Sequence, residues 1–246
     1  MANDGCVRIA MWSGPRNIST AMMRSFGNRS DAVVVDEPLY AHYLLASGAE
    51  HPGREEVIAR HETDWRKVVG ELTGPVPGGK RVWYQKHMAH HLLPGMDRAW
   101  IAGLTNCFLI REPREVITSF VKVVERPTAL DLGLPQQVEL FEAERGRTGR
   151  VPPVVDSRDI LKDPRGVLTG LCEAVGVDFD EAMLRWPPGP RATDGVWAKH
   201  WYASVEQSTG FGPYTPKDEP VPRGLEGVYE ECRALYEQLA AHRLGG

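Results

Sequence analysis

AMWSGPRNISTAMMRSF, residues 10–26, combines an apolar strand, a polar loop and the beginning of a helix. The strand leads into the loop at Ser13, and Ser19 and Thr20 stand where the helix is expected to start. This order is typical of phosphate sites, because the unpaired N–H groups at a helix N-terminus favour an anion. The stretch lacks the Gly-Lys pair of the ATP-type pattern G-x-x-x-x-G-K-[ST], so it predicts a site for some other anion.

Apolar runs alternate with helix-like runs along the rest of the chain. Strands are expected at 7–11, 32–38, 81–87, 106–113 and within 151–160. Helices are expected after Ser19, over 39–47 and 54–70, from Pro113, and over 163–177 and 225–242. This alternation predicts an α/β fold, a central parallel sheet flanked by helices on both faces. We expect a single domain over 1–246, with a lid or acceptor loop at 187–222, where Pro, Gly and aromatic residues gather.

The composition bounds the class of protein. The chain has 246 residues and a formal net charge of −4, which argues against general nucleic-acid binding. Its 4 cysteines form no C-x-x-C pair, so neither a zinc ribbon nor a disulfide framework is indicated. The polar start lacks the pattern of a signal peptide, and no apolar run is long enough for a membrane span. We therefore expect a cytoplasmic protein that does not insert into membranes; the sequence leaves its oligomeric state open.

Ligands of open parallel sheets bind beyond the carboxyl ends of the strands. The polar residues expected at those ends, after the first loop, are Asp36, Glu37, Lys86, His87, Arg111, Arg114, Asp156, Ser157 and Arg158. Arg16 adds a forked, permanent charge suited to phosphate. Arg111, and Ser119 two turns into the following helix, would suit a second phosphate, although a surface Arg with a helix Ser would also explain this pair. Ser19 and Thr20 would add hydroxyl donors to the first loop, or one of them would only cap the helix.

Two of these stretches together resemble the sulfotransferases that use 3′-phosphoadenylyl sulfate (PAPS). SGPRNIST, residues 13–20, is similar to their loop for the 5′-phosphosulfate, and REPREVITS, residues 111–119, is similar to their element for the 3′-phosphate. The resemblance continues through the strand and helix at 156–184. GPRATDGVWAKHW, residues 189–201, resembles the late R-x-x-G-x-x-W loop that closes over the nucleotide. Four elements in the expected order span nearly the whole chain.

The resemblance implies a P-loop-like, three-layer sulfotransferase fold and PAPS as donor, with no metal. It implies these donor-binding residues: Ser13, Gly14, Pro15, Arg16, Asn17, Ile18, Ser19, Thr20, Arg111, Ser119, Arg191, Gly195 and Trp197. Ala21 stands where many members carry an aromatic residue, so adenine stacking must come from elsewhere. The acceptor is expected to be a hydroxyl or amine of a small molecule or carbohydrate.

Two candidates for the catalytic base stand at expected strand ends. Glu37, before Pro38, resembles the catalytic Glu of bacterial and carbohydrate-acting sulfotransferases, and His87 resembles the catalytic His of the cytosolic branch. Lys86 and His87 are adjacent, so they should face opposite sides of the sheet. We favour Glu37 as the base. Lys86 or Arg16 would stabilise the bridging oxygen of the donor, and Asp36 would orient its neighbours.

Other interpretations stay open at this point. A P-loop kinase would need Mg²⁺ held by a loop hydroxyl and a strand-end carboxylate, for which Asp36 or Asp156 would serve. A module that binds a nucleotide without turnover is a third hypothesis. The aromatic segment 197–214 would either line an acceptor pocket or pack the late loop onto the sheet. His87, His90 and His91 have no carboxylate beside them to complete a zinc site.

Overall fold

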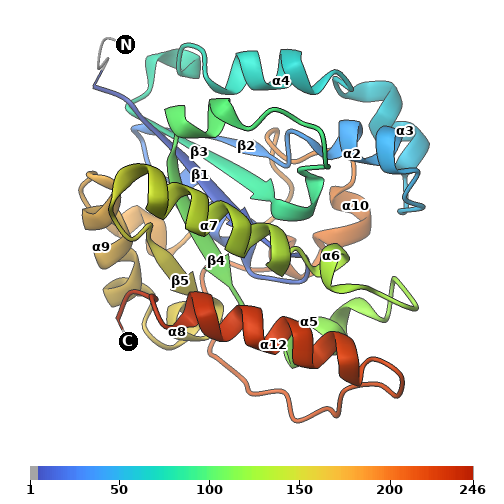
Figure 1. The fold of residues 1–246 in the computed structure, drawn as a ribbon. Helices are drawn as coiled ribbons and strands as arrows, with labels where there is room; N and C mark the ends of the chain where they lie inside the picture. Colours follow the sequence, from blue (N-terminus) through green and yellow to red (C-terminus); the bar gives the residue numbers. More distant parts are fainter. Residues whose placement is uncertain (1–4, 246) are drawn as a thin grey trace.

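The computed structural model describes residues 5–245, so the polar residues 1–4 of the start lie outside the described part. Within it, the strands pair in parallel in the order β2-β3-β1-β4-β5 (Figure 1). Their bounds are β1 (Val7–Ser13), β2 (Ala32–Asp36), β3 (Val82–Met88), β4 (Thr105–Ile110) and β5 (Val154–Asp156). The predicted parallel sheet is confirmed.

α-Helices follow β1, β2, β4 and β5, as the alternation predicted, whereas only short 3-10 helices lie between β3 and β4. The longer helices are α1 (Ser19–Gly27), α2 (Tyr40–Ser47), α3 (Arg54–Arg60), α4 (Trp65–Leu72), α5 (Pro113–Phe120), α7 (Leu134–Thr148), α8 (Ser157–Lys162), α9 (Pro164–Val175) and α12 (Glu226–Ala240). Four-residue helices are α6 (Ala129–Leu132), α10 (Ala198–Trp201) and α11 (Ala203–Glu206). Short 3-10 helices are η1 (Pro77–Gly79), η2 (Ala89–His91), η3 (Ala99–Gly103) and η4 (Glu181–Leu184).

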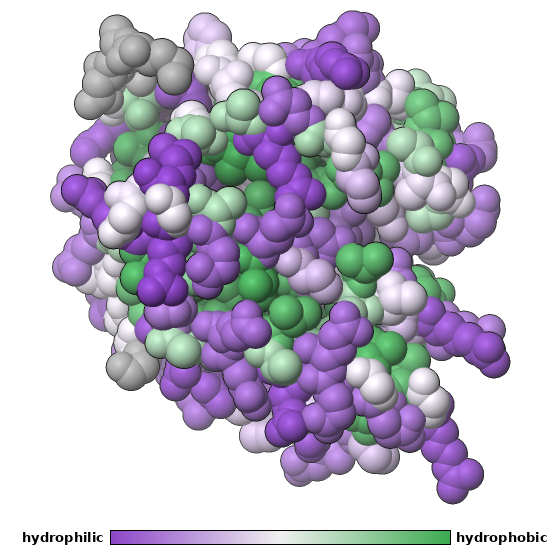
Figure 2. Space-filling model, viewed as in Figure 1, coloured by the Kyte–Doolittle hydropathy of each residue, from purple (hydrophilic) through white to green (hydrophobic). Residues whose placement is uncertain are grey.

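The side chains of each central strand alternate between two apolar layers, because successive residues of a strand point to opposite faces. Ile9 and Met11 of β1 pack with α1 and α9, whereas Ala10 and Trp12 pack with α4, α7 and α12. In Figure 1, α7 and α12 cross one face of the sheet. Figure 2 shows the outer surface on that side as mainly hydrophilic, with apolar side chains in smaller groups. Helices thus cover both faces, as expected.

One helical prediction needs correction, and one helix was not predicted. The segment 54–70 is not one helix, because residues 61–64 are non-helical and the Asp64 side chain accepts a hydrogen bond from the N–H of Arg66, which starts α4 afresh. Helix α7 was not predicted. Its start is marked by Gly133, at φ 75°, followed by Pro135 in the first turn, a combination that fits a helix beginning.

The strand order places a topological switch beside β1. The chain goes from β1 to β2 and β3 on one side of the sheet, and to β4 and β5 on the other. The loops that follow β1 and β4 therefore diverge and leave a crevice at the carboxyl ends, where such sheets bind ligands.

Candidate active site

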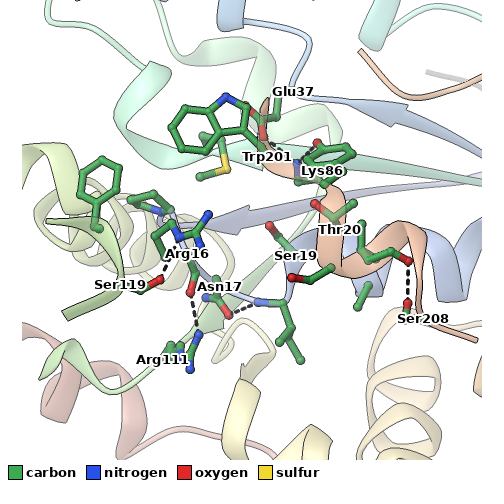
Figure 3. A pocket seen from close by; sticks show the side chains of 18 of the residues that line it. Arg16, Asn17, Ser19, Thr20, Glu37, Lys86, Arg111, Ser119, Trp201 and Ser208 are labelled. Atoms are coloured by element: carbon green, nitrogen blue, oxygen red, sulfur yellow. Dashed lines mark hydrogen bonds and ion pairs between the residues drawn. The ribbon is translucent and has the colours of Figure 1, made fainter. Parts of the chain in front are cut away.

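A cavity of about 390 Å³ lies at the carboxyl ends of the strands, within the usual size range of small-molecule sites. Residues 15–21, Arg111 and Ser119 line one end, and Glu37, Lys86 and Trp201 line the other. Figure 3 shows Arg16, Arg111 and Ser119 on one side of the cavity and Glu37, Lys86 and Trp201 on the other, with Ser19 and Thr20 near Lys86. The structure thus brings together most of the residues expected from the sequence.

The loop after β1 presents an open helix start to this cavity. The N-cap of α1 is Ile18, and no side chain caps that end. Instead, Asn17 fastens the loop: its Oδ1 accepts from the N–H of Ile18 at 2.8 Å, and its Nδ2 donates to the carbonyl of Leu109 at 3.1 Å. Among the described residues, the hydroxyls of Ser19 and Thr20 hold no partner. Neither hydroxyl caps the helix, so both are free to contact an anion at the N-terminus of α1.

Two guanidinium groups meet beside the loop. Arg16 Nε donates to Ser119 Oγ at 2.9 Å, and Arg111 Nη1 donates to the carbonyl oxygen of Arg16 at 2.8 Å. Arg16 is held at φ 53°, a left-handed conformation that is uncommon for a side chain of this kind. Burial, and then the charge of Arg111, lower the pKa of Arg16. A bound anion would offset this like-charge contact.

The late segment, residues 187–222, adds a further cation. Lys217 lines the cavity, and burial followed by the charge of Arg111 lowers its pKa. Nearby, Glu115 Oε2 accepts from Arg111 Nε at 2.9 Å, while Glu115 Oε1 accepts from the hydroxyl of Tyr214 at 2.8 Å. Glu115 therefore links the late segment to Arg111.

At the other end of the cavity, β2 and β3 place two carboxylates on one ammonium group. Lys86 follows Val82 and Tyr84 on the face of the sheet that α1 covers. Strand alternation alone would send Asp36 and Glu37 to opposite faces. Glu37 instead adopts φ 41°, and this left-handed turn lets both carboxylates contact Lys86.

The contacts of Lys86 are short and buried. Its Nζ lies 2.8 Å from Asp36 Oδ1, 2.6 Å from Glu37 Oε1 and 2.6 Å from the hydroxyl of Tyr202. Burial raises the pKa of Glu37; the Lys86 charge opposes this effect and the Asp36 charge adds to it. Burial lowers the pKa of Lys86, but the two carboxylates outweigh it and raise that pKa well above the ordinary value.

His87 lies on the opposite face of the sheet. Its ring stacks on Trp12, with centroids 4.4 Å apart, and its Nε2 lies 3.2 Å from Gln85 Oε1. It does not line the cavity, and burial lowers its pKa to about 3. Of the adjacent pair, Lys86 alone faces the cavity, as strand alternation requires.

Ser13 and Gly14 lie behind the cavity wall. The hydroxyl of Ser13 is buried and donates to the carbonyl of His87 at 3.3 Å. A Cβ on Gly14 would stand 2.3 Å from the carbonyl oxygen of Leu132, so this position admits no side chain. Both residues shape the loop from behind, and Pro15 is the first residue that reaches the cavity.

Gly14→Ala is expected to lower the free energy of unfolding by about 1–3 kcal/mol, because the methyl group must displace main chain rather than a mobile side chain. Urea denaturation of the variant checks this value. Gly146→Ala is the matched control, since a Cβ there meets nothing within 4 Å, and it should keep wild-type stability or exceed it. Equal stability of Gly14→Ala and wild type would contradict the close approach.

Three expected nucleotide contacts of the late segment do not line the cavity. Arg191 Nη2 donates to the carbonyl of Pro187 at 2.6 Å. The N–H of Gly195 donates to Asp36 Oδ2 at 3.2 Å, and Trp197 is buried with its Nε1 donating to the hydroxyl of Tyr202 at 3.2 Å. Gly195 and Trp197 thus support the carboxylate end from behind.

Other residues of the late segment reach the cavity in their place. They are Trp201, Tyr202, Ser204, Val205, Ser208, Gly210, Phe211, Gly212 and Lys217. The aromatic content of 197–214 did point to this segment, but the weak periodicity of the segment gave no means of telling which ring turns inward. Rings from elsewhere complete the wall: Tyr40, His51, His90 and His91.

Residues 5–245 contain no group of three or more His, Cys, Asp or Glu side chains placed to hold a metal ion. None of the helices in that range has the length and apolar character required to cross a membrane.

Solved structures share this architecture. The sulfotransferase domain of the Synechococcus PCC 7002 olefin synthase aligns over 94% of this chain and 94% of its own, with a TM-score of 0.58 and 19% identity. A sulfotransferase from Alicyclobacillus acidocaldarius aligns over 97% of both chains, with a TM-score of 0.54 and 14% identity. The fold is therefore the P-loop-like sulfotransferase fold, as expected.

Sequence comparison reaches closer relatives. Two Arabidopsis thaliana proteins, named branched-chain-amino-acid aminotransferase-like proteins 1 and 2, are 38% and 33% identical over 95% of this chain. The chain spans less than half the length of these curated relatives, 42% and 41% respectively. The family model described as a sulfotransferase domain matches residues 7–226. The chain therefore belongs to the sulfotransferase domain family.

Proposed function

We propose that this chain is a single-domain, PAPS-dependent, cytoplasmic sulfotransferase that acts on a hydroxyl or amine of a small molecule or carbohydrate. One observation carries the proposal: a cluster of cations and a buried carboxylate face each other across one cavity. Arg16 and Arg111 stand at one end and Glu37 at the other. Such an arrangement suits a negatively charged donor and a neutral acceptor that loses a proton.

The residues present fit the donor. The open start of α1, with Arg16, Ser19 and Thr20, suits the phosphosulfate, and Arg111, Ser119 and Lys217 suit the 3′-phosphate. Phe211 lines the same cavity, and we assign it to stacking on the adenine. It would replace the aromatic residue that many family members carry at the position of Ala21. The donor supplies the sulfuryl group.

Glu37 would accept the acceptor proton. Its Oε1 is bonded to Lys86, and its Oε2 has no hydrogen-bond partner among the described residues. The side chain keeps 13% of its surface exposed, on the cavity side. Burial raises the pKa of Glu37 towards the working pH, which favours general-base catalysis. The free oxygen can bond the attacking hydroxyl or amine, while Arg16 is placed to stabilise charge on the leaving phosphate.

The kinase hypothesis is less well supported by the carboxylates. Asp36 is bonded to Lys86, to the hydroxyl of Tyr202 and to the N–H of Gly195, so it has little capacity left for a metal ion. Asp156 caps α8 and accepts from Tyr236 at 2.5 Å, and it does not line the cavity. The non-catalytic hypothesis leaves Glu37 and its strained backbone without a role.

Adenosine 3′,5′-bisphosphate is expected to raise the melting temperature without added metal. At about 100 times its dissociation constant it should add about 2.7 kcal/mol, roughly 5–10 °C for a domain of this size. Arg111→Ala should reduce the shift strongly, because it removes a charge that lines the cavity. Differential scanning fluorimetry with EDTA, with Mg²⁺ and with an ATP control provides the measurement.

Arg114→Ala is the matched control. Arg114 lies three residues after Arg111, in the first turn of α5, but its guanidinium packs 5.5 Å from the centroid of the Tyr229 ring and does not line the cavity, so the shift should persist. A shift that requires both ATP and Mg²⁺ would support the kinase instead. Bisphosphate binding with no sulfuryl transfer to any phenol, sugar or amine would favour the non-catalytic module.

A further inference from the structure

A cluster of buried polar groups joins the late segment to Glu37. Tyr202, between α10 and α11, lies with its hydroxyl 2.7 and 2.8 Å from the two carboxylate oxygens of Asp36. The same hydroxyl accepts from Lys86 Nζ at 2.6 Å and from Trp197 Nε1 at 3.2 Å. The cluster therefore connects β2, β3 and a segment more than 100 residues further along the chain.

The bonding capacity of this cluster is almost fully used. An ammonium group has three N–H donors, and those of Lys86 go to Asp36, Glu37 and Tyr202. A tyrosine hydroxyl has one proton and two lone pairs; that of Tyr202 donates to Asp36 and accepts from Lys86 and Trp197. Each group is held in one orientation, and the free Oε2 of Glu37 is the exception.

We propose that Tyr202 is a positioning residue for the base: its hydroxyl ties Asp36 to Lys86 and so holds the Lys86 ammonium group against Glu37. This inference rests on the proposed role of Glu37. Tyr202 lines the cavity, but its hydroxyl is hydrogen-bonded to Asp36 and Lys86. Tyr202 therefore affects Glu37 through these two side chains. The late segment thus helps to position Glu37 and also forms part of the cavity wall.

Removing the hydroxyl has a defined electrostatic consequence. The charged and titratable groups that interact with Glu37 are Asp36 on β2, Tyr40 on α2, Lys86 on β3 and Tyr202. His51 before α3 and His91 in η2 line the same cavity, and Arg16 after β1 faces Glu37 from its opposite end. Without the Tyr202 hydroxyl, Asp36 loses a donor and attracts the Lys86 ammonium group more strongly. Glu37 then loses part of the charge that stabilises its ionised form, and its pKa rises further.

The test follows the Glu37 carboxyl directly, in ligand-free protein. We would label the glutamate side-chain carboxyls with ¹³C, identify the Glu37 signal by its loss in Glu37→Gln, and titrate it by NMR. The midpoint is expected to move to higher pH in Tyr202→Phe. Trp197→Phe, which removes the donor to the same hydroxyl, should move it in the same direction by less.

Tyr236→Phe is the matched control, since Tyr236 makes a similar tyrosine–aspartate bond, to Asp156, away from the cavity. Its Glu37 titration should stay that of wild type. An unchanged midpoint in Tyr202→Phe, or an equal shift in Tyr236→Phe, overturns the inference.

The titration needs neither donor nor acceptor, so it succeeds or fails apart from the proposed function. With an active acceptor in hand, Tyr202→Phe should lower kcat about tenfold and shift the acid limb of the rate profile to higher pH, while the KM for PAPS changes little. A fall in kcat with an unshifted profile would also overturn the inference.

Discussion

Glu37→Gln is expected to lower the rate of sulfuryl transfer from PAPS about 10²–10⁴-fold and to leave bisphosphate binding close to wild type. Glutamine keeps the size of the side chain but has no basic oxygen to take the acceptor proton. The bisphosphate contacts are assigned to Arg16 and Arg111 at the other end of the cavity, so they should survive. Single-turnover transfer and melting-temperature shifts measure the two properties separately.

Two further variants make this result specific. Glu56→Gln changes a carboxylate on the surface of α3, bonded to Lys199, and should keep the wild-type rate. His87→Gln should reduce stability, because His87 stacks on Trp12 in the core, and retain transfer. If Glu37→Gln stayed within tenfold of wild type while folded His87→Gln lost activity, Glu37 would not be the base.

Lys86→Met is expected to destabilise the fold by about 3–5 kcal/mol, the range found when one partner of a buried ion pair is removed. Lys86 is 1% exposed, and its loss leaves Asp36 and Glu37 close together without a cation. Urea denaturation measures the effect. Lys199→Met, which loses a surface contact with Glu56, should change stability little.

The destabilisation by Lys86→Met should depend on pH in a definite direction. Burial and the neighbouring Asp36 already raise the pKa of Glu37, and without the opposing charge of Lys86 that pKa rises further above the value in the unfolded chain. A carboxyl pKa that is raised in the folded state lowers stability as pH increases above the unfolded pKa of about 4. The deficit should therefore be larger at pH 8 than at pH 5. An equal deficit at both pH values would contradict the buried charge cluster.

Much of the fold followed from the pattern of the sequence. The β-branched and apolar runs located the strands, and strand alternation placed Lys86 and His87 on opposite faces of the sheet. The loop after β1 and the residues Arg111 and Ser119 came together because parallel strands end at one edge. These features depend on the periodicity of apolar residues, which a single sequence shows, and on a general rule about where parallel sheets bind ligands.

The charge cluster was not predictable in the same way. Glu37 reaches Lys86 because its backbone is left-handed, at φ 41°. The sequence does not indicate such a conformation, because it is uncommon for residues other than glycine. Tyr202 contacts Asp36 across 166 residues of sequence, in a segment without helical or strand period. Arg191, Gly195 and Trp197 were assigned to the nucleotide from a sequence pattern, and none of the three lines the cavity. Arg191 bonds to the carbonyl of Pro187, and Gly195 and Trp197 bond to Asp36 and Tyr202.

The late segment has a consequence for engineering. It supplies Lys217 near Arg111 and also Tyr202 beside Asp36, and Asp194 fastens it to α1 through a buried ion pair with Arg24. Under the proposed function, binding of the donor and positioning of the base thus depend on the same stretch of chain. Grafting this stretch from a relative to change the acceptor will change donor affinity at the same time. Selection for a new acceptor should therefore target Tyr40, His51 and His91, which line the cavity from other elements.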